Sequence, residues 1–234
     1  MYDPIEVTKK TEELVVHGTS KKYYRFRPTG FYGGIATADT VGCNLRCKFC
    51  WSGASVWDAQ HTGKFYSPEE VVTELHRIAG KKGYHQVRIS GGEPTIGKQH
   101  LLDLLHGINN KYTFILETNG VLLGYDHLYV EELSTFENLH VRVCLKGADV
   151  EEFSLFTGAN KGFEYQLKSL EYLRDTHISF NIAVVSVNAE KKQRLFQLLK
   201  EMNLEKVMIE EEEITLYPMV RARLQKEQLL PYFQ

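Results

Sequence analysis

Residues 41–51 read VGCNLRCKFCW and bring three cysteines, Cys43, Cys47 and Cys50, into one short stretch. A structural metal site normally closes its coordination sphere with four protein ligands, whereas a catalytic site keeps one position open. The fourth cysteine, Cys144, lies far along the chain in a strand-like run, and no disulfide partner can be assigned to it. The three clustered thiols therefore indicate a metal cluster that is only partly liganded by protein.

Outward from this stretch, short apolar or β-branched runs alternate with helical patterns. The runs occupy residues 35–41, 86–90, 113–117, 141–146, 178–185 and 207–217. This alternation is typical of βα units that build a parallel sheet. About six units predict an α/β fold, a partial (β/α)6 TIM-like barrel, since the complete eight-unit barrel typically needs about 250 residues.

The domain organisation follows from the absence of a long Pro/Gly/Ser linker in the sequence. We expect one core domain over residues 34–234, ending in a helix, preceded by a short extension over residues 1–33 that could form a hairpin. One helix is marked in detail: Ser67 can cap it, Glu70 completes a capping box, and Gly80 stands where a helix would stop.

Five polar or glycine-containing motifs follow the predicted strands. They are the cysteine stretch, GGEPT at 91–95, TNG at 118–120, LKG at 145–147 and SVN at 186–188. Ligands of parallel α/β folds bind beyond the carboxyl ends of the strands. The five motifs are therefore expected to face one site.

The C-x3-C-x2-C spacing, with Phe49 before the last cysteine, resembles the signature of the radical S-adenosylmethionine (SAM) enzymes, and GGEPT strengthens the resemblance. The resemblance implies a 4Fe-4S cluster on Cys43, Cys47 and Cys50, whose fourth iron is chelated by SAM. It further implies reductive cleavage of SAM to methionine and a 5'-deoxyadenosyl radical, which abstracts hydrogen from a substrate. The three cysteines would then be both metal ligands and catalytic residues.

The same resemblance assigns further residues to the cosubstrate. Lys146 would pair with the SAM carboxylate and count as catalytic, and Phe49 would pack near the adenine. The other expected SAM-binding residues are Gly91, Gly92 and Glu93 near the methionyl amino group, Glu117, Thr118 and Asn119 near the amino acid moiety or ribose, and Asn181, Ser186 and Asn188 near the ribose or adenine. Trp51 and Trp57 could line the site or cover the cluster.

A narrower likeness covers residues 141–173, which resemble the fourth strand and following helix of glycyl-radical-enzyme activases such as pyruvate formate-lyase activating enzyme. Lys146 and the pair Thr157–Gly158 match, but Cys144 stands where those activases have aspartate. The implied partners are a glycyl radical enzyme or a small-molecule substrate, and a reducing protein such as ferredoxin or flavodoxin. A compact small-molecule enzyme resembling 7-carboxy-7-deazaguanine synthase is the alternative, although this chain has CWS where that enzyme has Cys-Asp-Thr.

Two readings need no radical chemistry. The thiols could form a zinc site closed by His61, or they could be reduced cysteines gathered by chance, because thiolates also suit zinc. A non-enzymatic Fe-S or zinc module would explain the cysteines. It would leave GGEPT, ETNG and Lys146 at successive strand ends unexplained.

Composition and charge bear on the partners and the cellular compartment of the protein. Charged residues make up 25% of the chain and the net charge is −2, which gives no general electrostatic case for nucleic acid. A basic stretch at 21–27, KKYYRFR, could be a binding arm, but its alternation favours a strand with one solvated face. No apolar run is long enough for a bilayer span and the first residues do not resemble a signal peptide. Clustered reduced thiols favour the cytoplasm.

Overall fold

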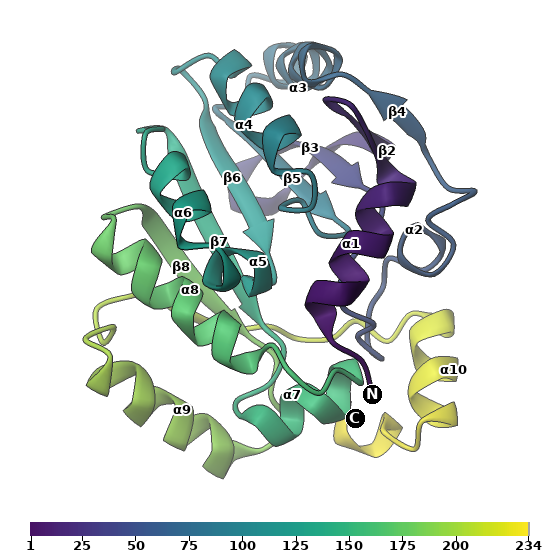
Figure 1. Cartoon of the computed structure of the whole chain (residues 1–234), viewed down its shortest axis with the longest axis vertical. Coiled ribbons are helices and arrows are strands. Elements are labelled where there is room, and N and C mark those ends of the chain that lie inside the picture. The colour runs from purple at the N-terminus through teal and green to yellow at the C-terminus, as the bar shows by residue number, and fades with distance from the viewer. Residues whose placement is uncertain (234) are drawn as a thin grey trace.

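The architecture is a single nine-stranded sheet covered by helices (Figure 1). The structure, a computed structural model, describes residues 1–233, so Gln234 of the predicted core domain lies outside the described residues. Six strands run parallel: β3 (Ile35–Thr40), β5 (Gln86–Gly91), β6 (Thr113–Thr118), β7 (Leu139–Leu145), β8 (Ser179–Val184) and β9 (Ile209–Glu211). The predicted partial barrel of parallel strands is confirmed.

Three more strands extend the sheet on the β3 side in antiparallel fashion. They are β1 (Val16–His17), β2 (Ser20–Thr29) and β4 (Lys64–Tyr66), and the order through the sheet is β1-β2-β3-β5-β6-β7-β8-β9, with β4 paired to β2. Strands β1 and β2 form a short hairpin, as expected. Before it lies a helix that the sequence analysis missed, α1 (Pro4–Val15), which Asp3 caps by accepting a hydrogen bond from the Ile5 N–H.

Most of the remaining helices connect successive strands, and α10 follows the last strand (Figure 1). They are α2 (Ala54–Trp57), α3 (Pro68–Lys82), α4 (Lys98–Gly107), α5 (Val121–Tyr125), α6 (His127–Leu133), α7 (Val150–Thr157), α8 (Phe163–Asp175), α9 (Ala189–Glu201) and α10 (Pro218–Lys226), with 3-10 turns η1 (Phe31–Gly33) and η2 (Leu230–Phe233). Among the described residues, every helix is too short or too polar to cross a membrane.

Two predicted boundaries were wrong. The capping box of α3 forms as expected between Ser67 and Glu70, but the helix continues past Gly80 to Lys82. Gly83 caps it with a left-handed backbone (φ 67°) that suits glycine. The predicted strand over 207–217 shrinks to the three residues of β9, whose pairing with β8 ends at Glu211. This strand pairs with β8 alone among the described residues.

The two faces of the sheet differ in chemistry. The face under the helices is apolar, with fully buried Val87, Phe114, Leu116, Val141 and Val143 in one continuous core. Burying each such side chain contributes about 1.5–3 kcal/mol of stability. The opposite, concave face carries polar side chains at the alternating positions, as strand periodicity requires. The fold therefore buries its hydrophobic face and presents charged groups inside the open barrel.

Strand β2 shows where the basic stretch goes. The expected strand forms and Arg25 is exposed, but Lys21 and Lys22 are buried rather than solvated. The Lys21 ammonium donates to the carbonyl oxygens of Glu93 (3.0 Å) and Pro94 (2.8 Å), and also to that of Ile96. Lys21 therefore supports the GGEPT loop through hydrogen bonds to its backbone carbonyl oxygens.

Candidate cluster and cosubstrate site

The cysteine loop leaves the carboxyl end of β3 and keeps its three thiols close to the protein interior. Cys47 is buried, Cys43 and Cys50 are half-buried, and all are free of disulfides. Backbone N–H groups of Leu45 and Ser52 donate to the sulfur atoms of Cys43 (3.3 Å) and Cys50 (3.4 Å). Such N–H···S contacts favour thiolates and tune iron-sulfur clusters.

Burial also shapes the acidity of these thiols. It raises the pKa of Cys43 to about 12, with help from the Glu93 carboxylate, and it raises that of Cys47 as well. A thiol in such a place becomes a thiolate when a metal binds it. Three soft thiolates on one loop fit a 4Fe-4S cluster, which would supply the electron for SAM cleavage when bound.

A single zinc ion fits less well. Among residues 1–233, no three His, Cys, Asp or Glu side chains converge as ligands of one ion. A cluster holds its three thiolates farther apart than a single ion does, because each thiolate binds a different iron. His61, the proposed closing ligand, is exposed and contacts Asp58 at 2.7 Å. The donor set therefore suits a cluster better than closed zinc coordination.

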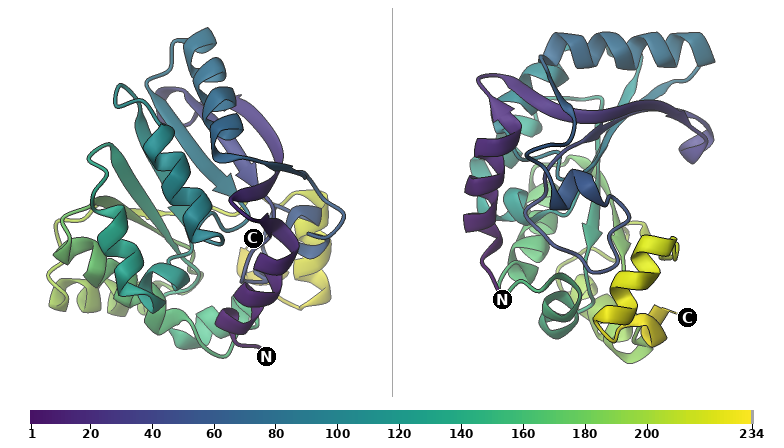
Figure 2. Two further views of the ribbon diagram at one scale, coloured as in Figure 1. Left: turned by 45° about the horizontal axis from the view of Figure 1, so that its top comes forward. Right: turned by 90° about the vertical axis from the view of Figure 1, so that its right-hand side faces the viewer.

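Segments distant in sequence hold the cysteine loop in place (Figure 2). The Lys48 N–H donates to the carbonyl oxygen of Phe156 at the end of α7 (2.8 Å), and the Arg46 N–H donates to the Tyr2 hydroxyl (2.7 Å). From α10, Arg223 donates to the Cys50 carbonyl oxygen at 2.7 Å. Both the N-terminal segment and α10 therefore support this loop.

The GGEPT loop after β5 interlocks with the cysteine loop through backbone contacts. The Gly92 N–H donates to the Thr40 carbonyl oxygen (2.9 Å), and the Glu93 N–H donates to that of Gly42 (2.7 Å). A Cβ on Gly92 would stand 2.0 Å from the Gly42 oxygen, and Gly91 has φ 99°. Both glycines are needed for this close approach.

The Glu93 carboxylate is buried and hydrogen-bonded to other groups of the protein. Its side chain is 1% exposed. One carboxylate oxygen accepts from the Thr95 N–H and from the hydroxyls of Thr95 and Thr118, and the other accepts from the Asn119 N–H at 2.9 Å. The carboxylate thus ties the β5 loop to the β6 loop, and its expected contact with the SAM amino group stays a prediction.

The TNG turn reaches the cysteine loop. Asn119 donates from its amide to the Asn44 side-chain oxygen (2.8 Å) and lies 3.8 Å from the Cys43 sulfur. Sequence reasoning missed Gln166 of α8, which is fully buried. Its amide bonds the carbonyl oxygens of Asn119 and Cys144, and its oxygen accepts from the Lys146 N–H (3.1 Å). An isolated glutamine in a helical pattern carries no signal that would have identified it.

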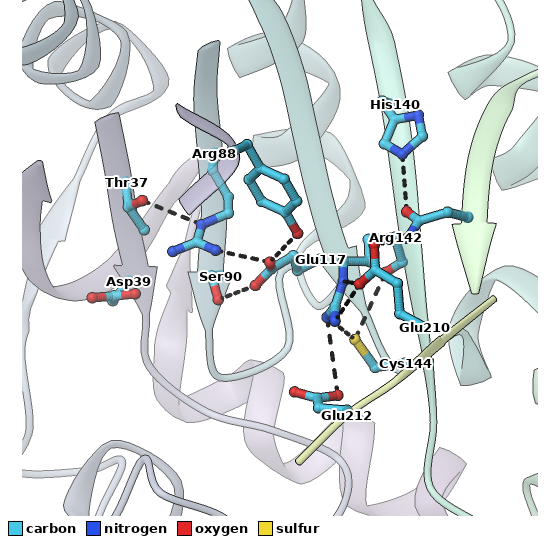
Figure 3. A network of polar contacts seen from close by, with 12 residues as sticks. Thr37, Asp39, Arg88, Ser90, Glu117, His140, Arg142, Cys144, Glu210 and Glu212 are labelled. Atoms are coloured by element: carbon cyan, nitrogen blue, oxygen red, sulfur yellow. Dashed lines mark hydrogen bonds and ion pairs between the residues drawn. The ribbon is translucent and has the colours of Figure 1, made fainter. Parts of the chain in front are cut away.

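Glu117 belongs to the concave face instead. Its carboxylate accepts from Arg88 (2.8 Å), Ser90 (2.7 Å) and the Tyr32 hydroxyl (3.3 Å), and Arg88 also donates to Thr37 (Figure 3). The expected position near the strand end is found, but these contacts link β3, β5 and β6 to one another. Its contact with the cosubstrate stays a prediction.

Strand β7 presents Arg142 and Cys144 on the concave face, and Lys146 follows directly after it. Arg142 pairs with Glu210 (3.0 Å) and donates to the Cys144 sulfur at 3.2 Å (Figure 3). Burial alone would lower the pKa of Lys146, but nearby negative groups raise it overall. Burial raises the pKa of the Cys144 thiol to about 12. Lys146 is therefore a cation beside the loop.

The other expected residues lie in three separate places. Phe49 packs against Phe156 and Phe233 (ring centroids 5.8 Å apart in both cases), and the Lys146 nitrogen lies 6.0 Å from its ring. Ser186 and Asn188 lie past the end of β8, where Asn188 caps α9 through the Lys191 N–H. Asn181 lies further down the concave face, bonded to His140 and Glu210.

The sequence is similar to GTP 3',8-cyclases of two organisms. It is 31% identical over 134 residues to a probable GTP 3',8-cyclase from Archaeoglobus fulgidus, which covers 56% of this chain and 42% of that protein. It is 32% identical over 96 residues to a GTP 3',8-cyclase from Helicobacter pylori, covering 38% and 28%. The chain spans less than half the length of these relatives.

Solved structures share the fold. SuiB from Streptococcus suis, bound to the precursor peptide SuiA, superposes with a TM-score of 0.62 at 20% identity over 83% of this chain and 44% of that one. TYW1 with a lysine-pyruvate adduct gives 0.56 at 16% identity over 98% and 89%. The model of the radical SAM superfamily matches residues 38–202, the region that holds the three cysteines and the interlocked loops. The chain belongs to the radical SAM superfamily.

Proposed function

We propose that the chain binds SAM on a 4Fe-4S cluster and cleaves it reductively to methionine and a 5'-deoxyadenosyl radical for hydrogen abstraction. The observation that carries this proposal is the interlock of three strand-end loops. Glu93 joins the GGEPT loop to Asn119, and Asn119 in turn reaches Asn44 and the Cys43 sulfur. Cluster ligands and the expected cosubstrate loop are thus fixed relative to each other before any ligand binds.

The chain's own residues have distinct parts in this proposal. Cys43, Cys47 and Cys50 would hold the cluster. The backbone of Gly91 and Gly92 packs against Thr40 and Gly42 and would present polar groups to the methionyl end of SAM. Lys146 supplies a cation for the SAM carboxylate. A reducing partner, such as ferredoxin or flavodoxin, would deliver the electron.

For the substrate we propose a small polar molecule. The concave face is lined by charged and hydrogen-bonding side chains, among them Arg88, Glu117, Arg142 and Glu210 (Figure 3). The GTP 3',8-cyclases named above are consistent with such a substrate, although they are longer than this chain. An activase role has weaker support, because Thr157 is buried and Gly158 simply ends α7.

The test uses anaerobically reconstituted protein. We expect one 4Fe-4S cluster per chain by iron and sulfide analysis, a change in the EPR signal of the reduced cluster on SAM addition, and slow formation of 5'-deoxyadenosine with dithionite. Cys47→Ala should lose the cluster and this activity, whereas His61→Ala should keep both. Stoichiometric zinc without iron, or a normal cluster in the Cys47 variant, would contradict the proposal.

A further inference from the structure

Two arginines on β2 share one buried carboxylate. Asp39 of β3 is fully buried, and it accepts from the Nε of Arg25 (2.7 Å) and from the Nε (2.7 Å) and Nη2 (3.3 Å) of Arg27. Two guanidinium charges against one carboxylate leave a net charge of +1 at this place. The arginines are therefore held rigidly by an anion that cannot neutralise both of them.

Strand register places this pair inside the open barrel. Arg25 is opposite Asp39 and Arg27 is opposite Thr37, and directly paired residues share a face of the sheet. Thr37 accepts from Arg88 within the concave network (Figure 3). The two guanidinium groups therefore belong to the polar face on which a substrate would lie.

The other concave charges balance one another. Arg88 pairs with Glu117 at 2.8 Å. On the far side, Arg142 and Lys146 are matched by Glu210 and Glu212, with Arg142 bonded to Glu210 and 3.9 Å from Glu212. The excess positive charge is thus confined to the β2–β3 side.

The arginines also keep donors for a ligand. Asp39 uses neither of the two Nη groups of Arg25 nor the Nη1 of Arg27, and the Tyr24 ring lies 5.4 Å from the Arg25 guanidinium. Their side chains remain 42% and 24% exposed, so a ligand can reach them. The Arg25 guanidinium lies 5.8 Å from the ring centre of Trp51, directly after the last cluster cysteine. The pair is therefore close to the reacting end of the proposed site.

We propose that Arg25 and Arg27 form an oxyanion subsite that binds a phosphate or carboxylate group of the substrate. The inference deepens, and rests on, the proposed radical SAM function. Guanidinium groups match the geometry of both oxyanions, and anchoring on Asp39 fixes them before binding, so little side-chain entropy is lost. The substrate is then an anionic small molecule, held with its charged group toward β2.

The experiment measures anion binding to reconstituted protein by calorimetry, with pyrophosphate and acetate as probes in chloride buffer. Arg25→Gln is the main variant, because Arg27 still pairs with Asp39 and the fold is retained. We expect the variant to bind the probe with an affinity at least tenfold lower than that of the wild type. Its affinity for SAM should change less than twofold. Arg77→Gln on α3, where an exposed arginine pairs with Glu74, is the matched control and should bind as the wild type does.

The outcomes distinguish a phosphate from a carboxylate ligand, and failure of the anion subsite from failure of the proposed function. Tighter pyrophosphate binding assigns a phosphorylated substrate, and tighter acetate binding a carboxylated one. No saturable binding, or an equal loss in Arg77→Gln, would overturn the subsite. A parallel loss of SAM affinity in Arg25→Gln would also overturn it, by assigning the arginines to the cosubstrate carboxylate. Wild-type protein that cannot cleave SAM would instead defeat the proposed function, whatever the probes show.

Discussion

Cys144 stands next to cations on the concave face, although its side chain is buried. Its sulfur lies 3.2 Å from Arg142 Nη1, and Lys146 is close enough to influence its acidity. A carboxylate at this position would therefore be paired, and a paired buried charge is near break-even for stability. We expect Cys144→Asp to fold with an almost unchanged melting temperature and to alter SAM affinity.

The neighbouring residue provides the control. Val143 points to the opposite, apolar face and is fully buried. Val143→Asp would leave an unpaired carboxylate there and should lower the free energy of unfolding by about 3–5 kcal/mol. Equal destabilisation of both variants by thermal denaturation would show that Cys144 is an ordinary core residue.

Lys21 gives a prediction about pH. Burial lowers the pKa of Lys21 to about 7, despite the nearby Glu93 and Glu12 carboxylates, whereas an unfolded lysine titrates near 10.4. Between these pH values the unfolded chain binds one more proton than the folded chain, so stability rises with pH. From pH 7 to pH 9 we expect the unfolding free energy of the wild type to rise by about 2 kcal/mol relative to Lys21→Met.

Urea denaturation of both proteins at several pH values measures this difference. Comparison with the methionine variant removes the titration of all other groups to first order. A difference that stays flat would mean that the three carbonyl acceptors keep the ammonium charged through that range, despite its burial.

At the scale of elements, α10 covers the cysteine loop through one side chain. Arg223 donates to the carbonyl oxygens of Lys48 (3.3 Å) and Cys50 (2.7 Å), and its guanidinium lies 5.1 Å from the ring centre of Trp57. Charge-assisted hydrogen bonds of this kind contribute about 1.5–3 kcal/mol. Arg223→Ala should therefore release the loop and speed cluster loss in air about tenfold, which corresponds to about 1.4 kcal/mol.

The decay of the visible absorbance of the reconstituted protein measures that loss. Arg221→Ala alters an exposed arginine of the same helix and should decay like the wild type. If both variants lose the cluster at the same rate, faster than the wild type, the Arg223 contacts are not what protects the cluster.

Some local features of the helices and loops could be predicted from the sequence, and others could not. The capping box of α3 and the glycines of GGEPT were predictable, because caps and close backbone approaches demand particular residue types. Helix α1 was missed because its mixed, polar sequence lacks a clear apolar stripe, and its burial depends on packing against other segments. The four protein donors around Glu93 also come from two loops that only the folded sheet brings together.

For the whole molecule, the parallel sheet was predictable because strand-like runs alternate with helical patterns, and this placed each motif at a strand end. The polar lining of the barrel was harder to foresee. Arg25, Asp39 and Glu210 come from separate runs, and their pairing depends on register and on an antiparallel strand joining the sheet. Sequence periodicity shows that side chains alternate, but it does not tell which distant charges meet.

The open barrel makes a prediction about local stability. Strand β6 has hydrogen-bonded neighbours on both sides, whereas β9 has three residues and pairs with β8 alone among the described residues. Edge elements with few contacts open at low free-energy cost. Hydrogen–deuterium exchange followed by mass spectrometry should therefore show much faster exchange in Ile209–Glu211 than in Thr113–Thr118. Equal protection would indicate that the free edge of β9 is covered in solution.

The contact between α10 and the cysteine loop has a consequence for biosynthesis. Arg223 is separated from Cys50 by 173 positions in the chain. At about 5–20 residues per second, a ribosome needs on the order of 10–30 s to add that length. A nascent chain thus displays its three thiols well before the helix that covers them exists. Delivery of iron and sulfide after release from the ribosome would spare a half-built site from oxygen.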